Sequence, residues 1–378
     1  MLEKSAYNVV RRGPDKTSVL KRNGSTYVHY LLHITGKMTE QPIVSDDETE
    51  FLLYNGEVYN YQDLGAYESD GPSILDAYCN EGINGFQKLD GEYSGVIHRP
   101  SENKAVIFRD VFGTKPIYMA YDSRGLGVAS YVSQLRSLNF QQILKVPVNS
   151  VLVIDIPSGR VEMKAFRSFD LNQHKDSYDD WCNAFQDAVK KRTSNSNVNY
   201  FIGLSSGYDS GLIAAVMTDI GVDFKSYSIQ AAEDVGVMRQ RASLVKHNEF
   251  MHLTKDQYDI QQSFLIANCE PYESPPRQTR HNGYSILKDK GAIGTGIICE
   301  KAVAEGCRVY ISGQGSDEII SDYGHAGRMA PGFLHSTIAG NFPNDLSKVF
   351  PWENFFTGIQ EEFLAKDEHV GGTYGLRS

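Results

Sequence analysis

The sequence predicts a β-rich α+β domain built as a sandwich of antiparallel sheets, followed by an α/β domain with a doubly wound parallel sheet. Residues 26–167 hold short apolar or alternating runs closed by Gly, Asp, Asn or Pro, which is typical of closely spaced strands. After Ser168 strands and helices alternate, which indicates parallel strands joined by right-handed crossovers. The predicted divisions are a first domain at 1–167, a polar linker at 168–176 and a second domain at 177–378.

Short strands account for most of the first domain. The runs are TYVHYLLHIT (26–35), EFLLYNGEVY (50–59), YSGVIHR (93–99), KAVIFRD (104–110), PIYMAYD (116–122), GLGVAS (125–130) and SVLVIDI (150–156). Helices are expected at Ser73–Glu81 and at Glu3–Val10. Strands at this spacing favour antiparallel sheets packed face to face.

Longer periodic segments follow in the second domain. The expected helices are SYDDWCNAFQDAVKKRT (177–193), GLIAAVMTDIG (211–221) and MRQRASLVKHN (238–248). The expected strands are VNYFIGL (198–204), FKSYSIQ (224–230) and RVYISG (308–313). This alternation predicts a parallel sheet with helices on both faces.

Charge and cysteine content exclude several classes of protein. The formal net charge of −10 argues against general nucleic-acid binding through phosphates. The five cysteines show neither a CxxC pair nor a zinc spacing, which fits reduced thiols in the cytoplasm. The chain has no apolar run near the roughly 20 residues of a membrane span and no signal-peptide pattern. We therefore expect a cytoplasmic protein without nucleic-acid or membrane partners.

The segment LSSGYDSG (204–211) lies between a predicted strand and a predicted helix. Ligands of open parallel sheets bind at the carboxyl ends of strands, and the first strand of this domain ends at Leu204. Ser206 and Gly207 allow the backbone to approach a ligand, and the helix N-terminus offers N–H groups to phosphate. Hydroxyl donors come from Ser205 and Ser210. The alternative is an ordinary capped helix start.

Asp209 adds a negative charge to this loop. A carboxylate cannot bind phosphate directly, so a metal ion between Asp209 and a pyrophosphate group is predicted. The loop contains no Lys and therefore lacks the GxxxxGK[ST] pattern. It resembles the SGGxDS pyrophosphate-binding loop of ATP pyrophosphatases, with Ser206 in place of the first Gly.

Four other segments resemble asparagine synthetases. ISGQGSDEIISDY (311–323) is similar to their SGEGxDE segment. YNGEVYNY (54–61) and RRGPD (11–15) resemble the NGEIYN and HRGPD segments of their class II glutaminase domain. RDVFGTKPIY (109–118) resembles RDxFGxKPLYY. All occur in the family's order, and together they indicate the asparagine synthetase family over nearly the whole chain.

This resemblance implies an N-terminal-nucleophile-hydrolase-like first domain and an ATP-pyrophosphatase second domain. It implies that ATP and Mg²⁺ activate a carboxylate, aspartate by family default, as an acyl-adenylate that an amine attacks, releasing AMP and pyrophosphate. The implied metal ligands are Asp209 and Asp317, and the implied catalytic residues are Gln314 and Asp317. The implied ATP-binding residues are Leu204, Ser205, Ser206, Gly207, Asp209, Ser210, Ile229, Ser312 and Gly313. For Ile229 an ordinary core position is an equal alternative.

The first domain departs from the family at its glutaminase site. RRGPD begins at Arg11, which leaves no room for the family's first strand and its N-terminal Cys nucleophile. The Arg that binds the glutamine carboxylate is Leu31 here, and leucine cannot make that pair. We therefore expect no glutaminase activity. The vestigial glutamine site that the resemblance implies comprises Asn55, Gly56, Glu57 and Asp70.

The second domain departs at two places. Gln314 replaces the Glu of SGEG and cannot act as a base, which points to an amine on a larger substrate rather than ammonia. The chain ends at FLAKDEHVGGTYGLRS (363–378), before further helices and a lysine of the family. The chain is thus expected to be truncated, to be completed by a second chain, or to use another cation, with Lys366, Arg328 and Arg377 as candidates.

The leading hypothesis is an ATP-dependent, AMP-forming amide ligase with a degenerate glutaminase domain. Its partners would be small-molecule carboxylate and amine substrates, with ammonia kept as an alternative amine, and a homo-oligomer is compatible with the sequence. The competing hypotheses are a non-catalytic nucleotide-binding pseudoenzyme and one subunit of a split synthetase.

Overall fold

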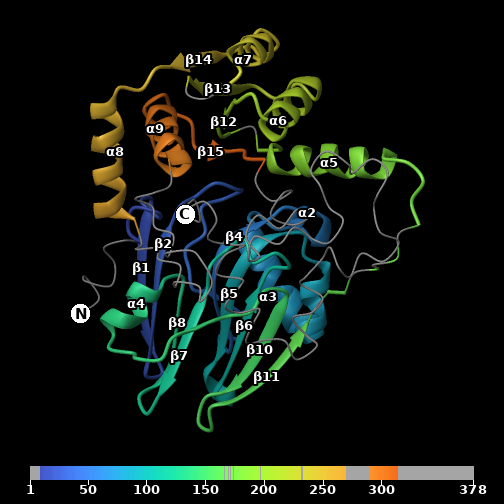
Figure 1. The fold of residues 1–378 in the computed structure, drawn as a ribbon. Helices are drawn as coiled ribbons and strands as arrows, with labels where there is room; N and C mark the ends of the chain where they lie inside the picture. Colours follow the sequence, from blue (N-terminus) through green and yellow to red (C-terminus); the bar gives the residue numbers. More distant parts are fainter. Residues whose placement is uncertain are drawn as a thin grey trace. The chain divides into compact units, whose positions relative to one another are not determined.

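The computed structural model describes residues 9–165, 167–168, 170, 172, 174–195, 197–230, 233–269 and 290–313. These residues divide into two compact units, with the division between residues 168 and 170 (Figure 1). Most of the helix expected at Glu3–Val10 lies outside the described residues. No helix in the described ranges is both long and apolar enough to span a membrane.

A six-stranded antiparallel sheet forms the centre of the first unit, in the order β11-β10-β6-β5-β4-β3. Its strands are β3 (Ile43–Val44), β4 (Phe51–Val58), β5 (Gly91–Arg99), β6 (Lys104–Arg109), β10 (Ser150–Asp155) and β11 (Arg160–Ala165). A hairpin of β1 (Lys16–Arg22) and β2 (Ser25–Leu31) and a sheet of β7 (Tyr118–Asp122), β8 (Gly125–Ala129) and β9 (Leu144–Lys145) accompany it. The helices are α2 (Tyr61–Leu64), α3 (Asp70–Glu81), η1 (Gly82–Lys88), η2 (Pro100–Glu102) and α4 (Val132–Ser137).

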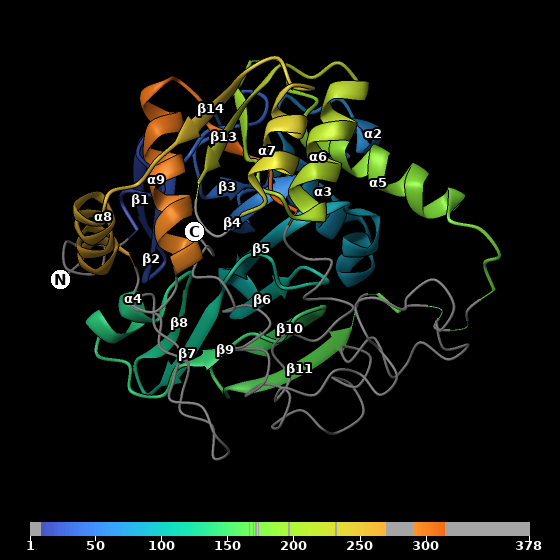
Figure 2. The same ribbon diagram turned by 45° about the horizontal axis from the view of Figure 1, so that its top comes forward.

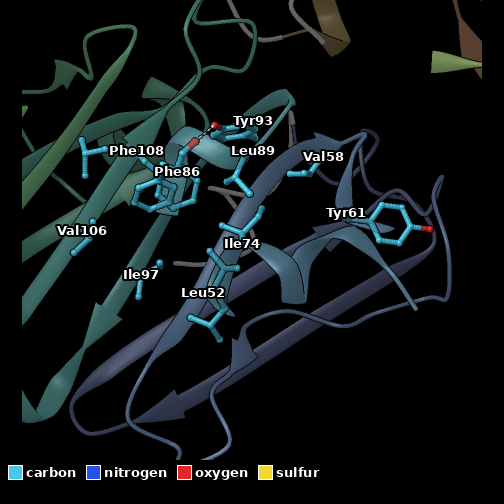
Figure 3. Packing of buried hydrophobic residues seen from close by; sticks show 12 residues of the cluster. Leu52, Val58, Tyr61, Ile74, Phe86, Leu89, Tyr93, Ile97, Val106 and Phe108 are labelled. Atoms are coloured by element: carbon cyan, nitrogen blue, oxygen red, sulfur yellow. Dashed lines mark hydrogen bonds between the residues drawn. The ribbon is translucent and has the colours of Figure 1, made fainter. Parts of the chain in front are cut away.

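Alternation along β6 gives the six-stranded sheet two buried faces. Val106 and Phe108 belong to a cluster that includes Ile74 of α3, part of which Figure 3 shows. Ala105 and Ile107 belong to a second cluster, which includes Ile117, Met119 and Val146 from around the three-stranded sheet. One face is therefore covered by a helix and the other by a sheet. The first unit is thus rich in antiparallel sheet, as expected, and residues of the three-stranded sheet pack against one face of the six-stranded sheet.

The second unit is built on a parallel sheet in the order β14-β13-β12-β15. Its strands are β12 (Tyr200–Gly203), β13 (Phe224–Ile229), β14 (Asn248–Met251) and β15 (Val309–Tyr310). Its helices are α5 (Asp179–Arg192), α6 (Tyr208–Asp219), α7 (Val235–Ala242), α8 (Lys255–Asn268) and α9 (Lys290–Ala304). The helix expected at 238–248 is wrong at its end, because the chain leaves α7 at Ala242 and Asn248 pairs with Ser226 of β13.

Helices cover both faces of this sheet, as Figure 2 shows for α6 and α9. Tyr200 and Ile202 of β12 pack with Met217 of α6, whereas Phe201 packs with Ile298 of α9. The described strands thus form the expected parallel sheet, with helices on both of its faces. The chain runs from β12 to β13 and β14 on one side and returns to β15 on the other. This reversal makes the carboxyl ends of β12 and β15 the place where such sheets bind ligands.

Candidate functional site

The loop between β12 and α6 lies at this reversal point. Leu204 is buried, and its N–H donates to the carbonyl oxygen of Tyr227 at 2.8 Å. Gly207 is the N-cap residue of α6, with an extended backbone at φ −68° and ψ 154°. The twelve-residue helix therefore begins directly after the loop and directs the positive end of its dipole there.

Two serines tie the loop to the first turn of α6. The Oγ atoms of Ser205 and Ser210 are 2.8 Å apart, and Ser210 Oγ also accepts from the N–H of Ser205 at 3.1 Å. The N–H of Gly207 donates to Ser205 Oγ at 3.0 Å. The structure thus brings together Ser205, Gly207 and Ser210, which the sequence predicted as phosphate-binding residues.

Arg241 of α7 donates hydrogen bonds to backbone carbonyl oxygens of the same loop. Its Nη1 donates to the carbonyl oxygen of Ser205 at 2.9 Å and to that of Gly207. The guanidinium lies against Gly211, where a Cβ would come within 2.7 Å of Arg241 Cζ. Only glycine leaves room for this contact. By binding the carbonyl oxygens, Arg241 orients the peptide groups of the loop.

Glu233 accepts hydrogen bonds from Ser206 of the loop, at the backbone N–H and at the hydroxyl. Its Oε2 accepts from the backbone N–H of Ser206 at 2.8 Å and from the Ser206 hydroxyl. The next residue, Asp234, caps α7 by accepting from the N–H of Val237 at 3.1 Å. Glu233 and Arg241 were not predicted, because they lie about 30 positions along the chain from the loop and belong to no pattern that marks a site.

The segment after β15 reaches the same place. The N–H of Ile311 donates to the carbonyl oxygen of Phe201 at 2.9 Å, which aligns Ser312 and Gly313 beyond the end of β12. A Cβ on Gly313 would come within 2.6 Å of Asp209 Cβ, so the two predicted segments touch. Close approach therefore requires glycine here.

The other predicted residues of this site stand apart from these contacts. Ile229, at the end of β13, packs with the apolar cluster that contains Phe201 and Ile298, and its side chain lies near Gly294 of α9. Gln314 and Asp317 lie outside the described residues. Within the described ranges, no three His, Cys, Asp or Glu side chains gather as metal ligands. Of the predicted metal ligands, Asp209 lies within the described residues, and its carboxylate could bind Mg²⁺ beside a phosphate group, because hard cations prefer oxygen ligands.

The predicted vestigial site of the first unit is assembled from β4 and the start of α3. Asp70 is buried and accepts from the Tyr54 hydroxyl at 2.7 Å and from the N–H of Val58 at 2.9 Å. Asn55, Gly56 and Glu57 lie between these two donors on β4. Gly56 has φ +140°, and a Cβ there would come within 2.0 Å of the carbonyl oxygen of Glu92. The four predicted residues therefore lie together, three on β4 and Asp70 at the start of α3.

Burial dominates the electrostatics of this place. Burial first, and then the negative charge of Asp70, raise the pKa of Glu57 to about 8, although the side chains of Thr35 and Lys115 oppose the shift. Burial also raises the pKa of Asp70. Among the described residues, Glu57 Oε2 is buried without a hydrogen-bond partner. Leu31 ends β2 and brings no charge that could bind a carboxylate.

Comparison with known families covers most of the chain. Residues 1–163 match the glutamine amidotransferase domain, and residues 181–349 match asparagine synthase. Glutamine-hydrolysing asparagine synthetase B of Escherichia coli is 27% identical over 341 residues, which are 82% of this chain and 59% of that protein. The nodule asparagine synthetase of Pisum sativum is 26% identical over 350 residues, which are 82% of this chain and 55% of that protein.

The chain thus spans less than two-thirds of the length of these relatives. Among solved structures, it is similar to a glutamine phosphoribosylpyrophosphate amidotransferase of Bacillus subtilis complexed with ADP and GMP. The TM-score is 0.34 and the identity 14%, over 61% of this chain and 67% of that one.

Proposed function

Because this chain belongs to the asparagine synthetase family, we propose that it is an ATP-dependent ligase that activates a carboxylate as an acyl-adenylate. An amine would then attack the acyl carbon, and AMP and pyrophosphate would be released. The observation that supports this proposal most is the loop between β12 and α6. It places Ser205, Gly207 and Ser210 at the N-terminus of α6. At this point the chain changes the side of β12 on which it adds strands, which is where open parallel sheets bind ligands.

Within this proposal the loop binds the phosphate groups of ATP. Backbone N–H groups and the hydroxyls of Ser205 and Ser210 would donate to phosphate oxygens, while Arg241 holds the loop carbonyls on the opposite side. Asp209 would bind Mg²⁺, with Asp317 proposed as the second carboxylate. Mg²⁺ supplies neutralisation of the phosphate charge when bound. Aspartate is the default carboxylate, and Gln314 favours an amine larger than ammonia.

Exchange of labelled pyrophosphate into ATP tests the adenylation step. With Mg²⁺ and a panel of carboxylic acids, we expect exchange with one acid and at least a tenfold lower rate in Asp209→Asn, because the lost charge weakens metal binding. Asp219→Asn, at the exposed end of the same helix, is the matched control and should keep the wild-type rate. ATP binding without exchange for any acid would favour the non-catalytic alternative.

We also propose that the first unit does not hydrolyse glutamine. Leu31 cannot pair with the carboxylate of glutamine, and the two charged side chains of the site, Glu57 and Asp70, are both acids, so neither can replace the missing cation. Glutamate release from glutamine should therefore stay at the background rate, measured beside a glutamine-hydrolysing relative as positive control. Release above background that depends on the intact protein would contradict this proposal.

A further inference from the structure

The N–H side of the loop already binds an anion that the chain itself supplies. Glu233 Oε2 accepts two hydrogen bonds from Ser206, one from its backbone N–H at 2.8 Å and one from its hydroxyl. The Ser206 hydroxyl is fixed in turn by the N–H of Asp234, at 3.3 Å. A carboxylate oxygen thus lies where a loop of this kind offers its donors to phosphate.

We propose that Glu233 sets the affinity of this loop for phosphate by competing with it for the N–H and hydroxyl of Ser206. One N–H cannot donate fully to a carboxylate and a phosphate oxygen, and the two anions repel each other at contact distance. Binding a polyphosphate must therefore displace the carboxylate of Glu233. This inference rests on the proposed function, because it assumes that the loop binds the phosphate groups of a nucleotide.

The contacts around Glu233 allow its charge to be removed without loss of the loop. Asp234 provides the cap of α7, so that helix does not depend on Glu233. The carbonyl side of the loop is bound by Arg241, and its serines bind each other. Among the described residues no Lys or Arg forms an ion pair with Glu233, and its carboxylate accepts the two hydrogen bonds from Ser206.

Glu233→Gln is the informative variant, because glutamine keeps an oxygen acceptor for Ser206 and removes the competing charge. We expect inorganic pyrophosphate and Mg²⁺-ATP to bind about tenfold more tightly to Glu233→Gln than to the wild-type full chain, measured by titration calorimetry. Glu233→Ala, which removes the acceptor as well, should shift the dissociation constants in the same direction. Glu300→Gln, an exposed glutamate of α9, is the control and should bind like the wild type.

The outcomes separate this inference from the proposed function. Equal binding of pyrophosphate by wild type and Glu233→Gln would overturn the competition and leave the nucleotide-binding proposal standing. Weaker binding by Glu233→Gln in the presence of Mg²⁺ would also overturn it, because Glu233 would then assist the ligand or its metal ion. Absence of binding to every variant for both ligands would contradict the proposed function together with the inference.

Discussion

Replacing Arg109 by Ala is expected to destabilise the first unit by about 3–5 kcal/mol. Arg109 is fully buried at the end of β6 and donates to the carbonyl oxygens of Gly113 and Val146 at 2.8 Å and of Lys115 at 3.1 Å. Alanine would leave a cavity and deprive these buried oxygens of their donors. Both effects destabilise the folded state, so the urea midpoint followed by circular dichroism should fall.

The turn formed by residues 110–115 adds to the destabilisation expected for Arg109→Ala. Asp110 is buried beside Arg109, and its carboxylate accepts from the N–H groups of Phe112, Thr114 and Lys115. Burial raises the pKa of Asp110, and the positive charge of Arg109 opposes that shift. Replacing Arg109 by Ala therefore also removes a positive charge that stabilises the buried carboxylate of Asp110.

Arg160→Ala is the control for this prediction. Arg160 belongs to the same unit, but its side chain is 76% exposed and pairs with Glu162 on the surface of β11. Its loss should change the free energy of unfolding by no more than about 0.5 kcal/mol. Equal urea midpoints for Arg109→Ala and Arg160→Ala would show that the buried hydrogen bonds of Arg109 do not stabilise the first unit.

Local patterns explain which parts of the fold could be predicted. The strands β4, β6 and β10 contain apolar residues on one or both faces, and the sequence places them to within about two residues. β1 was missed because most of its residues are exposed and it lacks an apolar face. β14 was assigned partly to a helix because its strand conformation depends on parallel pairing with β13, which a local window does not contain.

The same distinction applies to the candidate site. Ser205, Gly207, Asp209 and Ser210 lie within six consecutive residues, so their types and spacing are visible in the sequence. Glu233 and Arg241 reach the loop only because β13 lies next to β12 and brings α7 close to the start of α6. Contacts of this kind depend on the assembled sheet rather than on spacing.

Replacing Glu57 by Gln is expected to stabilise the first unit by about 4 kcal/mol at pH 8 and by less than about 1 kcal/mol near pH 5. The pKa of Glu57 is raised from an ordinary value of 4.5 to about 8, first by burial and then by the charge of Asp70. Between these two values the folded state binds more protons than the unfolded state. Stability contributed by the protonated carboxyl is therefore present below pH 4.5 and is lost as the pH rises towards 8.

Glutamine has nearly the same shape as glutamate and cannot ionise, so it removes this loss at high pH. The wild-type melting temperature should fall between pH 5 and pH 8 relative to that of Glu57→Gln. Glu68→Gln, whose side chain is 73% exposed and pairs with Lys37, should follow the wild type. Parallel curves for the wild type and Glu57→Gln would mean that Glu57 is ionised in the folded protein at neutral pH, with a cation or water compensating its charge.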